Sequence, residues 1–260
     1  MRSHARVLTL LLWCGAHCVR VSRVDTGQFE RVIAEGRALQ ERLVDLTPVA
    51  VGGTATALHC QHRYSLDVDV VSPLLSSRFA EVTAELERWK GWRTNRLNPP
   101  VLILGQHGGV ELGVRQLRRT IPLQTTQVRG LRIPTAAEML RVKAFLLTDR
   151  RATRDFVDLA ALILHLGAVA ATESTALLNL VYGPRAPLTW ISAFAEACES
   201  EPVDLAAVPL SAYKGLRAPL TEWAFVADRC RELGRGLLKL ELGEKLPAEL
   251  PADMTPESRP

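Results

Sequence analysis

Apolar residues recur at helical spacing in two segments of the amino-terminal half. In residues 25–46 they fall on one stripe at intervals of three and four, and Asp25 or Thr26 stands where it can cap the first turn. Residues 76–92 show the same periodicity. Both segments are therefore predicted to form amphipathic helices that bury one face. A shorter helix is predicted over residues 54–62.

Short apolar runs between these helices predict β-strands. Residues 65–71, with the sequence SLDVDVV, alternate polar and apolar positions with the period of two that is typical of a strand with one buried face. The runs 99–105 and 110–117 are separated by QHGG, and this glycine-containing turn predicts a hairpin. Further strands are predicted over residues 48–53 and 126–134.

The second half of the chain has a different pattern. Thr135 precedes an apolar run and is followed by Glu138 at the third helical position, which is a capping-box signal for the start of a helix. A second helix is predicted to end at Gly167, because glycine commonly terminates helices. From residue 168 to residue 240 the pattern is mostly helical, with no strand-like alternation.

These elements predict an α+β protein in which a sheet-containing part comes first and a mainly helical region follows it. We expect the sheet-containing part over residues 26–133 and the helical part over 134–245, with the boundary near Pro134. Residues 1–25 and 246–260 are expected to lie outside the folded core. The latter segment is rich in proline and polar residues, a composition typical of disorder.

Composition is that of an ordinary globular protein and excludes a global polycation. The 260 residues are 47% hydrophobic and 23% charged, with a net charge of +4. Between Arg115 and Arg154, however, lie nine arginines and Lys143 against only two acids, Glu138 and Asp149. This local excess could attract phosphate groups. The alternative is a set of solvated side chains scattered over several elements.

Cysteines and the amino terminus bear on the compartment. The five cysteines form no C-x-x-C pair, which favours reduced thiols in a cytoplasmic protein. Residues 1–21 have a basic start and a short apolar run that resembles the core of a signal peptide, but His17 and Arg20 interrupt it. A secretion signal, a translated upstream extension and a loosely docked segment remain the alternatives. We predict a cytoplasmic protein with no membrane partner.

Two aspartates on one strand are the first candidate for chemistry. Asp67 and Asp69 alternate with apolar residues and therefore point to the same face, where two carboxylates repel each other unless a cation lies between them. Hard oxygen ligands suit Mg²⁺ or Mn²⁺. A D-x-D pair can also lie on a solvated strand face with no metal.

A glycine pair precedes these aspartates. Gly52 and Gly53 lie between a predicted strand and a predicted helix, where backbone N–H groups can approach a phosphate at the helix amino terminus. Alone, the pair is compatible with a simple tight turn. Followed after thirteen residues by Asp67, it predicts a phosphate cradle beside a metal site, an arrangement that can bind a nucleoside triphosphate (NTP).

The sequence VAVGGTATALHCQHRYSLDVDVV resembles the signature of the nucleotidyltransferase superfamily that includes DNA polymerase β. Within it, the text looks like the AbiEii/AbiGii toxin branch of type IV toxin–antitoxin nucleotidyltransferases. A second block, PTAAEMLRVKAFLLTDRRATRDFVDLAAL, resembles that branch's Lys…Arg-Asp-x-x-Asp helical segment. The resemblance covers about residues 29–167. It implies a nucleotidyltransferase-type mixed sheet flanked by helices, followed by a helical region that contributes to the active site.

The resemblance implies a role for each matching residue. Asp67 and Asp69 resemble the metal-binding pair. Arg63 and Ser65 match the family's R-x-S-x-D-x-D run. The residues that resemble the triphosphate loop are Gly52, Gly53 and Thr54.

The helical block contributes further candidates, each with a structural alternative. Lys143 resembles a phosphate-contacting lysine, although a lysine at the edge of an apolar stripe can simply extend its charge into water. Asp155 or Asp158 resembles the acid that completes the site, although acids in a first helical turn are common caps. Many superfamily members use a third carboxylate, for which Glu111 is the best candidate here. Asp158 is the alternative.

The function that the resemblance implies is metal-dependent transfer of a nucleoside monophosphate from an NTP to a hydroxyl acceptor. An RNA acceptor, such as tRNA, and an antitoxin protein partner are implied in the same way. Two alternatives stay open. One is a catalytically weak nucleotide- or RNA-binding module with the same fold, and the other is transfer to a hydroxyl of a protein.

Overall fold

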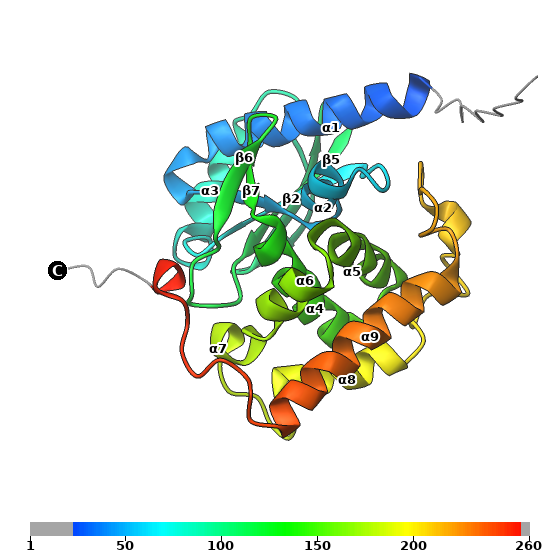
Figure 1. The fold of residues 1–260 in the computed structure, drawn as a ribbon. Helices are drawn as coiled ribbons and strands as arrows, with labels where there is room; N and C mark the ends of the chain where they lie inside the picture. Colours follow the sequence, from blue (N-terminus) through cyan, green and yellow to red (C-terminus); the bar gives the residue numbers. More distant parts are fainter. Residues whose placement is uncertain (1–22, 256–260) are drawn as a thin grey trace, which may run out of the picture.

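The computed structural model describes residues 23–255. The apolar run at the amino terminus, with Cys14 and Cys18, and the last five residues lie outside this range. The first element is helix α1 (Arg23–Arg42), which already includes Asp25 and Thr26, so the helix starts earlier than the predicted cap. Figure 1 shows α1 running along one side of the sheet-containing part, with the later helices gathered on the other side.

A mixed five-stranded sheet organises the first half. Its strand order is β1-β2-β5-β4-β3, in which β2 and β5 are parallel and the other neighbours are antiparallel. A separate two-stranded hairpin pairs β6 with β7. The strands are β1 (Val49–Val51), β2 (Asp67–Ser72), β3 (Arg93–Asn98), β4 (Leu102–His107), β5 (Val110–Gln116), β6 (Thr125–Val128) and β7 (Leu131–Pro134).

Helices connect these strands and then make up the rest of the chain. The predicted hairpin is present as β4 and β5, and the predicted helical second half contains no strand between residues 135 and 255. Besides α1, the α-helices are α2 (Gly52–Cys60), α3 (Phe79–Glu87), α4 (Ala136–Arg150), α5 (Thr153–Leu166), α6 (Ala168–Thr175), α7 (Leu178–Tyr182), α8 (Trp190–Glu199) and α9 (Trp223–Leu242). The fold is therefore the predicted α+β arrangement, with a mixed sheet and helices.

One hydrophobic cluster joins the two halves. Val32 of α1 and Val68 of β2 belong to the same buried cluster as Leu140 of α4 and Phe156 of α5. The predicted boundary near Pro134 coincides with the passage from β7 to α4. Because the sheet and α4 share this core, the position of α4 relative to the sheet is fixed by packing.

The start of α4 confirms half of the predicted capping box. The Thr135 hydroxyl accepts a hydrogen bond from the Glu138 backbone N–H at 3.2 Å, as an N-cap does. The Glu138 side chain does not return to Thr135. It is fully buried and pairs with Arg119 and Arg141 instead, because two guanidinium groups satisfy a buried carboxylate better than one backbone N–H.

The carboxyl-terminal segment departs from the expectation that residues 246–260 lie outside the folded core. Met254 is buried in a small cluster with Leu177 and Val181, and Asp253 accepts a hydrogen bond from Gln124. A few apolar anchors thus hold a segment whose composition predicts disorder. Among residues 23–255, no single helix is long and apolar enough to cross a membrane. Only α5 joined to residues 168–182 across a 119° bend reaches that length and hydropathy.

Candidate active site

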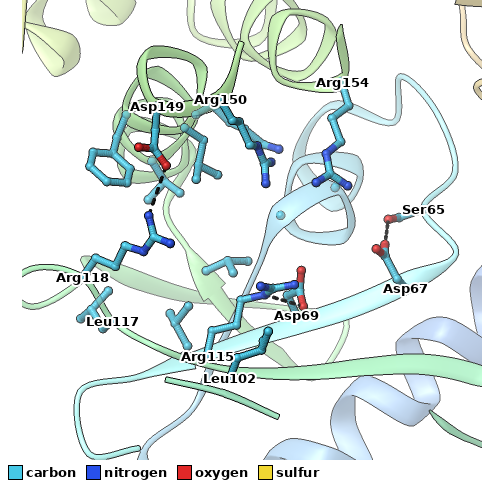
Figure 2. Close-up of a pocket in the computed structure, with 18 of the residues that line it drawn as sticks. Ser65, Asp67, Asp69, Leu102, Arg115, Leu117, Arg118, Asp149, Arg150 and Arg154 are labelled. Carbon is cyan, nitrogen blue, oxygen red and sulfur yellow. Dashed lines mark hydrogen bonds and ion pairs between the residues drawn. The ribbon is translucent and has the colours of Figure 1, made fainter. Parts of the chain in front are cut away.

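A single cleft of about 720 Å³ collects most of the predicted residues. It lies between the open face of the sheet and α4, and its walls include the residues expected to bind metal and phosphate: Gly52, Gly53, Arg63, Ser65, Asp67, Asp69, Glu111 and Lys143. Thr54, Asp155 and Asp158 do not line it. Figure 2 shows Asp67 and Asp69 on the floor of the cleft, with arginines reaching toward it from above and from the side.

Strand alternation places the two aspartates side by side. Asp67, Asp69 and Val71 are half-buried on the cleft face of β2, while Val68 and Val70 are buried on the other face. The side chain of Asp69 is 28% exposed. The pair is therefore reachable from the cleft but flanked by apolar surface.

Each aspartate uses one carboxylate oxygen within the protein. The Ser65 hydroxyl donates to Asp67 Oδ1 at 2.8 Å, and Arg115 Nε donates to Asp69 Oδ1 at 2.9 Å. Within residues 23–255, neither Oδ2 atom has a hydrogen-bond partner. Two adjacent carboxylates with free oxygens form a donor set that fits a hard divalent cation such as Mg²⁺. Asp67 and Asp69 are therefore the residues that would hold the metal.

Gly113 makes room for the Asp69 carboxylate. It lies directly opposite Asp69 on the parallel strand β5, so both residues face the cleft. A Cβ atom at position 113 would lie 2.0 Å from Asp69 Oδ1, well inside van der Waals contact. Only glycine allows Asp69 to adopt this position next to Arg115.

Glu111 lies beside the pair without completing a three-carboxylate cluster. It is opposite Asp67 in the same parallel register and is exposed on the cleft face. No group of three His, Cys, Asp or Glu side chains in the described part of the chain is close enough to hold one metal ion. Glu111 thus faces the cleft, and its role as a third carboxylate stays a prediction.

The turn from β1 into α2 contains the two glycines for which a phosphate cradle is predicted. Gly52 has a φ of +72°, which favours glycine, and Gly53 packs against two polar side chains. A Cβ atom on Gly53 would lie 2.5 Å from Arg63 Nη2 and 2.8 Å from Ser65 Oγ. The loop therefore brings a guanidinium and a hydroxyl next to the amino terminus of α2, where an anion is favoured.

Thr54 serves the strand rather than the cleft. It is buried, and its hydroxyl donates to the Asp67 backbone carbonyl at 2.6 Å. This differs from the expected contact with a triphosphate. Thr54 instead fixes the start of β2 relative to α2.

A buried charge network lies behind the cradle. Asp158 of α5 is fully buried and accepts hydrogen bonds from Arg63 Nε at 2.8 Å and from His62 Nε2 at 2.7 Å. Lys143 Nζ lies 2.7 Å from its second oxygen. Burial alone would raise the pKa of Asp158, but Arg63, Lys143 and His62 outweigh burial and hold that pKa well below its ordinary value.

Asp155 is the second acid of this network. It is fully buried and pairs with Lys143 at 3.3 Å and with Arg150 Nη2 at 2.8 Å. Burial raises its pKa, and the charges of Lys143 and Arg150 more than compensate, so the net shift is downward. Asp155 and Asp158 are thus ionised groups that orient cations at the cleft wall, and neither reaches the cleft itself.

His62 is the clearest residue that sequence reasoning missed. The predicted helix over residues 54–62 would include it, but α2 ends at Cys60 and the His62 side chain is only 3% exposed. Burial lowers the pKa of His62 in spite of the bond to Asp158, so the ring is neutral near pH 7 and Nε2–H is the donor. Only the tertiary contact with Asp158 could have revealed this role.

The arginine-rich stretch divides between interior and cleft. Arg119 and Arg141 are buried against Glu138, and Arg118 pairs with Asp149. The lining of the cleft includes five arginines of this stretch: Arg115, Arg118, Arg119, Arg150 and Arg154. Figure 2 shows Arg150 and Arg154 pointing into the cleft from the α4–α5 side. The local charge excess is thus divided between buried ion pairs and the cleft, and its attraction for phosphate stays a prediction.

Comparisons with known proteins place the fold. The sequence matches no protein-family model and no curated protein. The structure is similar to that of JHP933 from Helicobacter pylori, with 18% identity and a TM-score of 0.50 over 86% of this chain and 96% of that one. It is also similar to MenT4, a nucleotidyltransferase toxin of Mycobacterium tuberculosis H37Rv, with 18% identity and a TM-score of 0.51 over 89% and 88%. The chain thus has the nucleotidyltransferase fold.

Proposed function

We propose that this protein is a metal-dependent nucleotidyltransferase that transfers a nucleoside monophosphate from an NTP to a hydroxyl acceptor. The observation that carries this proposal is the placement of Asp67 and Asp69, each with a free oxygen, in one cleft with the Gly52–Gly53 bend. A bound Mg²⁺ or Mn²⁺ would neutralise the carboxylate repulsion and stabilise charge that develops on the triphosphate.

The proposed reaction replaces one bond at phosphorus. The acceptor oxygen forms a bond to the α-phosphorus, and the bond from that phosphorus to the oxygen bridging to the β-phosphate breaks. Pyrophosphate leaves with the electron pair, and the acceptor proton passes to a nearby base, for which exposed Glu111 is the candidate. The helix amino terminus at Gly53, with Arg63 beside it, would bind the leaving phosphates.

The cations of the helical half would act on the same triphosphate. Lys143 and Arg150 form part of the cleft wall, and Asp155 and Asp158 fix both of them through ion pairs. We therefore assign Asp155 and Asp158 as positioning residues. The Lys143 ammonium is buried between Asp155 and Asp158, so direct contact with phosphate would require it to leave one of these partners.

We further propose an RNA acceptor, such as tRNA, and a toxin-like role of the AbiEii type with an antitoxin protein as partner. Exposed Arg154, with Arg115 and Lys214 on other walls of the cleft, gives the entrance the positive charge that a nucleic-acid backbone requires. The similarity of the fold to a nucleotidyltransferase toxin is consistent with this role.

One observation favours the second candidate, a nucleotide-binding module with weak turnover. Arg115 holds Asp69 from the neighbouring strand, and a cation must compete with this guanidinium for the same carboxylate. If Arg115 keeps its place when nucleotide binds, binding without transfer follows.

A labelling assay tests both candidates. Purified full-length protein is incubated with radiolabelled NTPs, Mg²⁺ and total tRNA, alongside Asp69→Ala and a control, Asp228→Ala, which removes an exposed acid of α9. Label on RNA that only Asp69→Ala abolishes supports transfer to RNA. Label on protein identifies a protein acceptor, and nucleotide binding without label supports the binding module. The absence of both binding and transfer contradicts the proposed function.

A further inference from the structure

We propose that the end of the cleft beyond Asp69 is a nucleobase subsite, which selects the base of the incoming NTP. This inference rests on the proposed function. The subsite, called here the apolar lobe, is lined by Val71, Leu102, Leu117, Val142, Phe145 and Leu146.

The apolar lobe begins one step along the strand from the proposed metal ligands. Val71 follows Asp69 on the same face of β2, about 7 Å further along the strand. The cradle at Gly53 and Ser65 lies at the other end, next to Asp67. A nucleotide with its outer phosphates in the cradle and its α-phosphate at the aspartates therefore directs its sugar and base toward Val71.

The side chains of the apolar lobe face an open cavity rather than the core. All six are half-buried, and of these only Val142 packs against the main hydrophobic cluster of the described residues. Apolar side chains that line a cleft without filling it are typical of a small-molecule site. Their position on two facing walls, the sheet and α4, suits a flat ligand.

One wall of the apolar lobe is a fixed aromatic surface. Phe145 stacks on Tyr182 with ring centroids 4.3 Å apart and planes 9° from parallel, and the Arg119 guanidinium lies 5.5 Å from the Tyr182 ring centroid. Burial raises the pKa of Tyr182 to about 12, so the ring carries no charge. Stacking on such a surface tolerates any base, because every base has a π-face.

A polar pair at the rim supplies groups that can read the edge of a base. Arg118, after β5, donates to Asp149 of α4 at 3.2 Å, so the pair spans the two walls of the cleft (Figure 2). Both side chains are largely exposed, and such a pair has little stability of its own. A base in the apolar lobe can exchange this contact for hydrogen bonds to Asp149 as acceptor and Arg118 as donor.

The test compares a ligand with a base and a ligand without one. Isothermal titration measures binding of magnesium tripolyphosphate, and of the magnesium complex of each common NTP, to the full-length protein. The variants are Leu146→Ala, which removes contact area, and Leu117→Trp, which fills the apolar lobe. The control, Leu164→Ala, truncates an exposed leucine of α5 outside the cleft. Thermal melting confirms that each variant is folded.

We expect Leu146→Ala to weaken binding of at least one NTP about tenfold, and Leu117→Trp to weaken it more, with tripolyphosphate affinity unchanged. Equal weakening of both ligands, or no change in either variant, overturns the subsite while leaving the proposed function intact. A loss that affects acceptor KM but not NTP affinity assigns the apolar lobe to the acceptor and also overturns it. If the wild-type protein binds neither ligand, the proposed function falls and the subsite with it.

Discussion

The protein has two pairs of aspartates near the cleft, one facing it and one buried behind its wall. The two pairs differ in burial and in the number of carboxylate oxygens that the protein already occupies. Asp67 and Asp69 are half-buried on a strand and meet the protein through one oxygen each. Asp155 and Asp158 are fully buried on a helix and contact cations through both oxygens. The same residue type thus provides an open donor set in one place and a closed ionic network in the other.

This difference indicates that the two pairs have different tasks. A buried carboxylate is tolerated only when fixed cations compensate its lost hydration, and Lys143, Arg63 and Arg150 supply that compensation. The carboxylate oxygens of Asp155 and Asp158 are therefore all occupied and cannot bind a ligand. The strand pair is compensated only in part, so a divalent cation has both charge and free oxygens to bind.

The largest expected effect separates the pairs by activity. Asp69→Asn should lower nucleotide transfer about a thousandfold or more, because a neutral amide cannot hold the metal that stabilises the transition state. The free energy of unfolding should change by less than about 0.5 kcal/mol, since Asp69 is partly exposed. Transfer assays and urea denaturation measure the two quantities. If Asp69→Asn lowers the free energy of unfolding in proportion to the loss of activity, Asp69 stabilises the fold and is not a metal ligand.

Asp158→Asn should show the reverse pattern. Loss of this carboxylate leaves Lys143 and Arg63 without their buried partner, and we expect unfolding free energy to fall by about 3–5 kcal/mol. Asp149→Asn is the matched control, because Asp149 is 48% exposed and pairs with Arg118 at the surface. Its effect should stay under about 0.5 kcal/mol. Equal effects of the two substitutions would contradict the assignment.

Gly113→Ala tests whether the position of the Asp69 carboxylate determines metal binding by the strand pair. The new Cβ would collide with Asp69 Oδ1, so the carboxylate must turn away from its present position. We expect Mn²⁺ affinity, measured by electron paramagnetic resonance, to fall about tenfold, as for the loss of a group that orients a metal ligand. Gly236→Ala, where a Cβ would meet nothing within 4 Å, should leave that affinity unchanged.

The smallest expected effect is the response to acid. The pKa values of Asp155 and Asp158 are lowered in the fold, so their stabilisation is complete above the unfolded-state value of about 4 and is lost as pH falls toward the folded-state values. At pH 4 the loss should be about 0.4 kcal/mol per aspartate. Denaturation at a series of pH values should show this decline in the wild type and a shallower one in Asp158→Asn. A steeper decline in the variant would exclude the network as its source.

Local signals in the sequence predicted much of the fold. Alternation in SLDVDVV placed Asp67 and Asp69 on one face, and Gly167 ended α5 as expected. The missed strand, β3, has the polar sequence RTNRLN and pairs only at the edge of the sheet, so it carries no apolar period. The predicted strand over 126–134 is the hairpin β6–β7, whose turn at Arg129 and Gly130 has positive φ at both residues.

The sequence predicted the site residues that lie close together in the chain. It did not predict contacts between residues that are far apart in the chain. The Gly52–Gly53 bend and the two aspartates lie within one strand–helix–strand unit, and their order along the chain was sufficient to bring them together. Arg63 and Asp158 are 95 positions apart, so no spacing rule could pair them. Gly113 and Arg115 act on Asp69 only because β2 and β5 are parallel neighbours, a register that the sequence pattern leaves open.

The bond from Asp158 to Arg63 has a consequence for recombination between related chains. A chimera that takes its sheet-bearing half from one parent and its helices from another must inherit a cation and a carboxylate that match across the junction at Pro134. If the parent that supplies the sheet-bearing half lacks a cation at position 63, the helix from the other parent brings a buried carboxylate with too few positive charges around it. Exchange of halves at this boundary is therefore restricted to parents that share this pair.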